Sequence, residues 1–299
     1  MGHHVIVGAG PVGTATAQHL MEMGHQVTVV TRSGTGPDGT RRIAADAADQ
    51  GRLIELAQGA DAIYNCANPR YHRWPVDWPP IAAAMLAAAE TGGAGLVTMS
   101  NLYGYGPVDG PMTEDLPLAA TTVKGRVRAR MWREAIAAHE AGRVRVTEAR
   151  GSDYVGMGAR SVLSEVVLPR VRAGRRAFAP VDFDLPHSLT YTGDVGRLLA
   201  VLGTDDRSWG RAWHVPTGPA TTLREAARLY AQLAGARAPR LTSIPTVVIR
   251  AIGLANPEVA EVVEMSYQFR RPFVLDSTAA QETFGLRPTP LADALRTLL

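Results

Sequence analysis

The stretch HHVIVGAGPVGTATAQHLMEMGHQVTVVTRSG, residues 3–34, decides the fold of this 299-residue chain. A short apolar run at residues 5–7 is followed by a glycine-rich turn and by a segment with helical character to about Met23. Gly24 is suited to end that helix, and a second apolar run follows at residues 27–30. This order predicts a buried strand, a tight turn, a helix and a second buried strand.

The turn carries Gly8, Gly10 and Gly13 in the spacing G-x-G-x-x-G. Glycines allow a tight turn and a close approach of the backbone to a pyrophosphate, and the N-terminus of the following helix offers unpaired N–H groups. The motif is weak alone, but strands on both sides make it specific. It predicts a dinucleotide site; the alternative is a fold that has kept the motif and lost the ligand.

The residues that end the second predicted strand indicate which dinucleotide binds. A carboxylate at this point would bind the ribose 2′-hydroxyl of NAD, but Thr31 and Arg32 stand here. No acid repels a 2′-phosphate, and the Arg32 guanidinium can bind it. The sequence thus favours NADP(H) over NAD(H), unless Arg32 is only a surface side chain.

Strands and helices are expected to alternate through the first half of the chain. Further strands are expected at residues 60–67, 94–100 and 144–150, and helices at residues 80–90 and 124–141. The alternation predicts an α/β fold, a Rossmann doubly wound parallel sheet with helices on both faces. From about residue 155 it breaks. We expect a dinucleotide-binding domain at 1–155 and a smaller C-terminal substrate-binding lobe at 156–299, with some segments returning to the sheet.

Composition excludes several classes of protein. The single cysteine, Cys66, rules out a disulfide framework and suits a reducing compartment. No apolar run approaches the ~18 residues that a membrane span needs. The first predicted strand begins almost at once, which leaves no room for a signal peptide. We expect a cytoplasmic protein that does not bind a membrane.

The charge pattern argues against nucleic acid as a partner. The formal net charge is only +3, and no block of like charge occurs. Arg126, Arg128, Arg130 and Arg133 crowd together, but helical spacing spreads them around the cylinder. No cluster of His, Cys and Asp has metal-ligand spacing. The expected partner is a small-molecule substrate, with no nucleic acid and no metal.

Later segments carry a resemblance to a known family. They are AADAADQGRLIELAQGADAIYNCANP (44–69), SNLYGYGP (100–107), ARGSDYVGMG (149–158), SLTYTGDVGRLLAVL (188–202) and the ending from residue 275. They resemble the extended or atypical short-chain dehydrogenase/reductases, the NAD(P)-dependent epimerase/dehydratase superfamily. The resemblance covers nearly the whole chain. One departure is the glycine spacing, which in extended members is usually G-x-x-G-x-x-G.

The resemblance implies a set of cofactor-binding residues. In the family, an Asp that matches Asp46 contacts the adenine, and residues that match Cys66 and Ala67 line the nucleotide. The full implied set is Gly8, Gly10, Pro11, Val12, Gly13, Arg32, Asp46, Ala47, Cys66, Ala67 and Lys124.

Lys124 is the only lysine of the chain. In the family, the helix after the fifth strand carries Tyr-x-x-x-Lys, whose side chains lie one turn apart. That lysine binds the nicotinamide ribose and lowers the pKa of the tyrosine, which exchanges a proton with the substrate. Lys124 matches the lysine and is implied to face the cofactor, but Ala120 stands where the tyrosine belongs.

Other residues are candidates to complete the catalytic set. Asn101 matches the family's catalytic serine and can donate a hydrogen bond to a carbonyl. Tyr103, on the loop after the fifth strand, is our first candidate for the proton donor, ahead of Tyr105, Tyr154 and Tyr191. A packed structural tyrosine is the alternative for each.

Two functions are compatible with these residues. The first is an NADP(H)-dependent oxidoreductase or isomerase that acts on a small carbonyl or hydroxyl compound through Lys124, Asn101 and Tyr103. The second, motivated by Ala120, is a non-catalytic NADP(H)-binding or redox-sensing protein. Many relatives pair through a four-helix interface, so the resemblance also suggests a homodimer.

Overall fold

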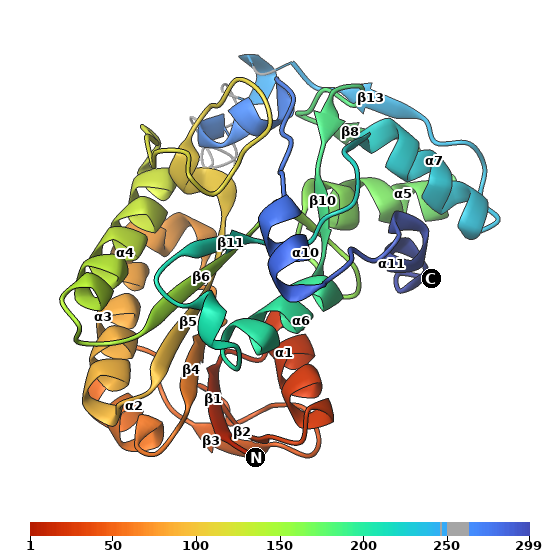
Figure 1. Ribbon diagram of the computed structural model, residues 1–299. Helices are drawn as coiled ribbons and strands as arrows, with labels where there is room; N and C mark the ends of the chain where they lie inside the picture. Colours follow the sequence, from red (N-terminus) through yellow and green to blue (C-terminus); the bar gives the residue numbers. More distant parts are fainter. Residues whose placement is uncertain (246, 250–262) are drawn as a thin grey trace.

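The computed structural model describes residues 1–245, 247–249 and 263–299, and its centre is a seven-stranded sheet (Figure 1). The strands lie in the order β11-β6-β5-β4-β1-β2-β3, and each pair is parallel. They are β1 (His3–Val7), β2 (Gln26–Thr31), β3 (Arg41–Ala44), β4 (Ala62–Asn65), β5 (Gly95–Asn101), β6 (Val146–Gly151) and β11 (Ala212–His214). The predicted doubly wound α/β fold is confirmed.

Helices cover both faces of the sheet (Figure 1). One face packs on α1 (Pro11–Glu22), α6 (Thr192–Leu202) and α10 (Thr278–Phe284), and the other on α2 (Gln50–Ala57), α3 (Trp74–Gly92) and α4 (Val123–Glu140). Side chains alternate between the faces along a strand, so Ile6 joins the first core while Val5 and Val7 join the second. Burial on both faces explains the continuous apolar runs of the strands.

The second half of the chain builds most of a smaller lobe, at the upper right of Figure 1. Three two-stranded sheets form there. They pair β7 (Asp153–Val155) with β10 (Leu189–Tyr191), β9 (Pro186–His187) with β12 (Thr221–Thr222), and β8 (Ala177–Ala179) with β13 (Leu241–Ser243). The helices in the described residues of this lobe are the π-helix η3 (Val162–Val167), α5 (Leu168–Arg172), α7 (Leu223–Leu233), the 3-10 helix η5 (Ser266–Phe269) and α11 (Leu291–Arg296).

Three elements of this half lie on the large sheet. Strand β11 pairs with β6 at the edge, and the short 3-10 helix η4 (Asp206–Ser208) precedes it. Phe284 of α10 packs on Trp213 of β11 with 4.7 Å between ring centroids. Helix α6 packs closely on α1, since a Cβ at Gly196 would lie 2.5 Å from the Ala15 Cβ. The two halves therefore share one framework.

Helix α3 is longer than the sequence predicts, because it spans Trp74–Gly92 and not only residues 80–90. Pro79 and Pro80 lie inside the helix, where proline removes a hydrogen bond and usually breaks the element. The fully buried ring of Trp78 holds this turn in the core. Tertiary packing thus overrides the local signal. The other two predicted helices and the predicted strands agree with the structure to within about two residues at each end.

Candidate functional site

A cavity of about 630 Å³ lies at the carboxyl ends of the central strands, where open α/β sheets bind ligands. Gly10, Pro11 and Val12 at the start of α1 line one part of it. Asn101, which ends β5, and Tyr103, which follows it, line another part, together with residues of β7. Both halves of the chain therefore contribute to its wall.

The glycine turn is shaped so that its backbone can contact a ligand directly. Gly8 has φ 108°, and a Cβ there would lie 2.5 Å from the carbonyl oxygen of Cys66. A Cβ at Gly13 would lie 1.9 Å from the Gly8 carbonyl oxygen. At Gly10, by contrast, a Cβ would meet no atom within 4 Å. Gly8 and Gly13 thus allow the turn to form, and Gly10 leaves its outer side open, which fits a bound pyrophosphate.

The other predicted cofactor residues divide into two groups. Cys66 and Ala67 follow β4, which is shorter than predicted and ends at Asn65, and both line the cavity. Burial raises the pKa of the Cys66 thiol to about 12, so this side chain is no nucleophile at neutral pH. Arg32, Asp46 and Ala47 lie outside the cavity wall, after β2 and β3. Arg32 and Asp46 are exposed, and the Asp46 carboxylate accepts the Ala48 N–H at 2.9 Å.

One partner of Lys124 is a carboxylate that the sequence does not reveal. The side chain is only 1% exposed, and its Nζ lies 2.7 Å from Oε2 of Glu264. The Lys124 backbone N–H donates to the other oxygen of the same carboxylate at 3.1 Å. Its Nζ also lies 4.5 Å from the ring centroid of Tyr71, which lines the cavity, whereas Lys124 does not line it. Lys124 is therefore positioned to act on the site through Tyr71.

Position 120 lies outside helix α4. The helix begins at Val123, and its N-cap, Thr122, accepts the Gly125 N–H at 3.2 Å. Ala120 precedes the cap and donates its N–H to the Gly104 carbonyl at 3.1 Å. A Cβ at Gly125 would lie 2.5 Å from the Ala120 Cβ. The one-turn spacing expected between positions 120 and 124 is therefore not formed here.

Asn101 and Tyr103 lie together in the cavity wall, on the short 3-10 helix η2 (Leu102–Tyr105) and its cap. The Asn101 Oδ1 accepts the Tyr103 N–H at 3.1 Å, which leaves the Asn101 amide as a donor. The Tyr71 hydroxyl donates to the Tyr103 hydroxyl over 3.5 Å, so the Tyr103 proton remains available. Burial, and secondarily the charge of Asp153, raises the pKa of Tyr103. Tyr103 is therefore protonated at neutral pH and carries a proton that it can donate, while the raised pKa makes it a weaker acid than a free tyrosine.

The structure adds an Asp–His pair that the sequence does not indicate. Asp153 lines the cavity, and its Oδ2 lies 3.1 Å from Nε2 of His187. The buried His187 ring stacks on Phe269 and Phe273, with centroids 5.2 and 5.3 Å away. The two residues are 34 positions apart and meet because β7 and β10 pair. Asp153 and Tyr103 thus both line the cavity, and the charge of Asp153 contributes to the raised pKa of Tyr103.

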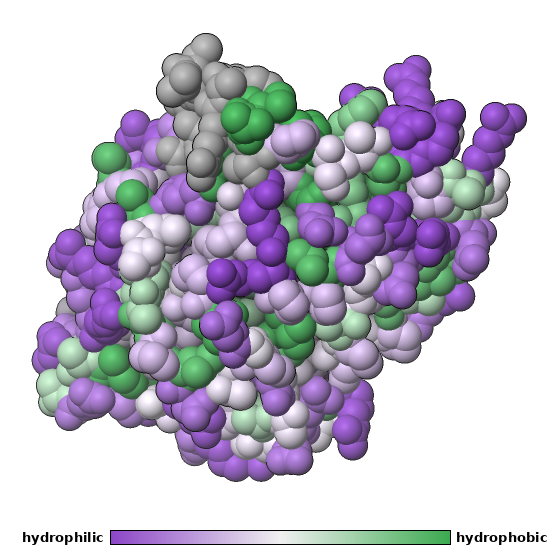
Figure 2. Space-filling view, turned by 90° about the horizontal axis from the view of Figure 1, so that it is seen from above, coloured by the Kyte–Doolittle hydropathy of each residue, from purple (hydrophilic) through white to green (hydrophobic). Residues whose placement is uncertain are grey.

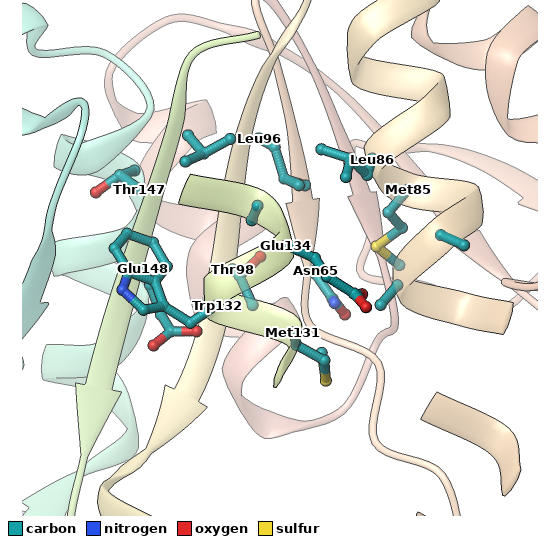
Figure 3. Close-up of a pocket in the computed structure, with 14 residues that line it drawn as sticks. Asn65, Met85, Leu86, Leu96, Thr98, Met131, Trp132, Glu134, Thr147 and Glu148 are labelled. Atoms are coloured by element: carbon teal, nitrogen blue, oxygen red, sulfur yellow. The ribbon is translucent and has the colours of Figure 1, made fainter. Parts of the chain in front are cut away.

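A second, much smaller cavity of about 30 Å³ lies under the sheet, between β4–β6 and helices α3 and α4 (Figure 3). Asn65, Glu148 and Trp132 point into it among apolar side chains. It is large enough for a water molecule but not for a substrate. The functional argument therefore rests on the larger cavity.

The described surface offers few other features. On the face seen in Figure 2, hydrophobic residues form separate groups among hydrophilic ones. No helix among the described residues is long and apolar enough to cross a membrane. In the same ranges, no group of three or more His, Cys, Asp or Glu is placed to hold a metal ion.

A comparison of the sequence with known protein families shows the family of this chain. The family described as "NAD dependent epimerase/dehydratase family" matches residues 4–181, more than half of the chain and including the glycine turn and the strands up to β6. The chain belongs to this family. No curated protein matches the chain.

Solved structures of other proteins share this architecture. MoeE5, in complex with UDP-glucuronic acid and NAD, is 22% identical with a TM-score of 0.79; the match covers 99% of this chain and 97% of that one. UDP-glucose-4-epimerase from Stenotrophomonas maltophila, with bound NAD and formylated UDP-arabinopyranose, is 19% identical with a TM-score of 0.80, over 100% and 97%. The dTDP-glucose 4,6-dehydratase from Bacillus anthracis, in complex with NAD, is 13% identical with a TM-score of 0.78, over 99% and 96%.

Proposed function

We propose that the chain is an oxidoreductase or isomerase that binds a nicotinamide dinucleotide and acts on a small carbonyl or hydroxyl compound. One observation carries the proposal: a single cavity joins the open glycine turn at Gly10 to the polar groups of Asn101, Tyr103 and Asp153. A dinucleotide bound at the turn would extend toward those groups. When bound, the nicotinamide supplies or accepts a hydride.

Within this proposal, Tyr103 replaces the missing tyrosine at position 120. Reduction of a carbonyl needs one proton for each hydride, and Tyr103 holds a proton that no described neighbour accepts. The Asn101 amide can donate to the same carbonyl oxygen and polarise it. Lys124 acts as a positioning residue, because its ammonium fixes Tyr71, whose hydroxyl orients Tyr103.

We further propose that NADP(H) is the preferred cofactor. Arg32 is exposed at the end of β2 and forms no ion pair with any residue of the described ranges. Its guanidinium is therefore available to a 2′-phosphate. The solved relatives bind NAD, so this preference rests on Arg32 alone.

The second candidate function is binding without hydride chemistry. It is favoured by the absence of a phenol at position 120 and by the ion pair that ties Lys124 to Glu264. In either case we expect a cytoplasmic protein with a small-molecule ligand, and a homodimer by analogy with relatives.

Two measurements separate these functions. Fluorescence titration should show NADPH binding, and a panel of carbonyl compounds should then reveal substrate-dependent oxidation of NADPH. If the wild type binds NADPH but oxidises it no faster than the Tyr103→Phe variant with any of the carbonyl compounds, the result supports the non-catalytic sensor. An absence of any NADPH or NADH binding contradicts both candidates.

A further inference from the structure

A buried arginine lines the main cavity beside the proposed proton donor. Arg128 lies on α4 and is 7% exposed, whereas Arg126, Arg130 and Arg133 on the same helix are exposed. Its guanidinium carbon lies 4.6 Å from the ring centroid of Trp74 and 4.3 Å from that of Trp78. The two indoles pack against the guanidinium and exclude water from it.

The hydrogen bonds of Arg128 are incomplete. A guanidinium offers five N–H groups, yet the only hydrogen bond of Arg128 within residues 1–245, 247–249 and 263–299 is a long one of 3.4 Å to the Met99 carbonyl. Its Nε is buried without a partner there. No carboxylate in those ranges forms an ion pair with it. A buried cation without an anion is unfavourable unless a ligand compensates.

The acids that influence Arg128 or line the cavity with it already have other partners. Glu148 influences the pKa of Arg128, but its Oε1 accepts from Nε of Arg150 at 2.7 Å. In the cavity wall, Asp153 is paired with His187, and Glu165 accepts from Arg160 at 2.9 Å. Burial lowers the pKa of Arg128, yet an arginine keeps its charge at neutral pH. The charge of Arg128 is thus left for a molecule that enters the cavity.

The surroundings indicate the chemistry of that molecule. Burial raises the pKa of Tyr71, Tyr103 and Tyr154, so their hydroxyls are neutral at neutral pH and do not neutralise the cation. The glycine turn, where the pyrophosphate would lie, is formed by a different part of the wall, at Gly10. A planar carboxylate matches the fork of a guanidinium that packs against two indole rings.

We propose that Arg128 binds the carboxylate of an oxo-acid or hydroxy-acid substrate, whose reacting carbon then faces Tyr103. This inference rests on the function proposed above and narrows its substrate class to acids. Arg128 would contact the substrate directly, and Trp74 and Trp78 would hold the guanidinium in place.

The test measures binding separately from turnover. Intrinsic tryptophan fluorescence, to which Trp74 and Trp78 contribute, is recorded while 2-oxo and 3-oxo monocarboxylates are added. Each acid is matched with its methyl ester and with inorganic phosphate at equal ionic strength. We expect each acid to bind at least about tenfold more tightly than its ester. Equal affinity for acid and ester would overturn the proposal, and a preference for phosphate would overturn the carboxylate assignment.

Variants separate recognition from packing. Arg128→Met should abolish the preference for acid over ester while NADPH affinity stays within about twofold, and Arg128→Lys should retain part of it. The control Arg130→Met, exposed on the same helix, should change neither. If Arg128 has only a structural role, Arg128→Met should lower the affinities for acid and ester equally. If Arg128→Met does not fold, the affinities of the wild type and of Arg128→Lys for acid and ester still test the proposal. If the wild type does not bind NADPH, the proposed function is refuted. The proposal for Arg128 is then decided by the relative affinities for acid and ester alone.

Discussion

Replacing Glu264 by Gln should destabilise the protein more than replacing Lys124 by Met, although the two residues form one ion pair. The reason is their unequal burial: the lysine side chain is 1% exposed and the glutamate 21%. Glu264→Gln leaves a buried ammonium with no counter-charge from this residue. Lys124→Met leaves a carboxylate that can reach water, and the Met side chain fills most of the space.

The magnitudes follow from the burial. Removing one partner of a fully buried pair costs about 3–5 kcal/mol, and the partial exposure of Glu264 reduces this to about 2–3 kcal/mol for Glu264→Gln. For Lys124→Met we expect about 1 kcal/mol, since the remaining carboxylate is partly hydrated. The double variant should be more stable than Glu264→Gln alone, because the buried ammonium that lost the Glu264 charge is gone.

Urea unfolding at pH 7 of the wild type, both single variants and the double variant measures these differences in free energy of unfolding. Arg130→Met, in an exposed ion pair with Glu134, serves as the control and should change stability by less than about 1 kcal/mol. A Lys124→Met variant less stable than Glu264→Gln, or additive losses in the double variant, would refute the reasoning.

Three further predictions concern the site. Arg32→Ala should weaken NADP(H) binding at least about tenfold and leave NAD(H) within about twofold; equal losses in fluorescence titration would contradict the 2′-phosphate role. Tyr103→Phe should lower the rate of carbonyl reduction by about 10²–10⁴-fold without changing the Kd for NADPH. Because the pKa of Tyr103 is raised, the wild-type rate should show no loss from Tyr103 ionisation up to about pH 10, and a fall assigned to Tyr103 below pH 9 would count against it. Gly10→Ala should fold normally but bind NADPH poorly, whereas Gly13→Ala should lose stability because its Cβ would lie 1.9 Å from the Gly8 carbonyl; the reverse pattern in unfolding and binding assays would be inconsistent with the turn geometry.

Local patterns were sufficient for the fold. The glycine turn and the alternation of apolar strands with helices depend on neighbours in sequence, and they predict the parallel sheet and its five inner strands. The short edge strands β3 and β11 were not predicted. Helix α3 shows the limit of such patterns. Its two internal prolines predict that the helix starts at about residue 80, but buried Trp78 stabilises the preceding helical residues by packing in the core. No local signal reports that kind of tertiary support.

The site was predictable only in part, for a related reason. Glu264 lies 140 residues from Lys124 and His187 lies 34 from Asp153, so neither pairing has a sequence spacing to reveal it. Arg128 is hidden for another reason: it stands among exposed arginines on one helix, and only the position of α4 against α3 shows which of them is buried. Long-range contacts define the chemistry here, and a single sequence does not carry them.

A crystal structure of the protein with NADP⁺ would test the central claim most directly. We predict the pyrophosphate on the backbone N–H groups that follow Gly10, and the nicotinamide C4 within roughly 4–5 Å of a substrate position that the Tyr103 hydroxyl reaches. A dinucleotide bound elsewhere, or a nicotinamide directed away from Asn101 and Tyr103, would contradict the account.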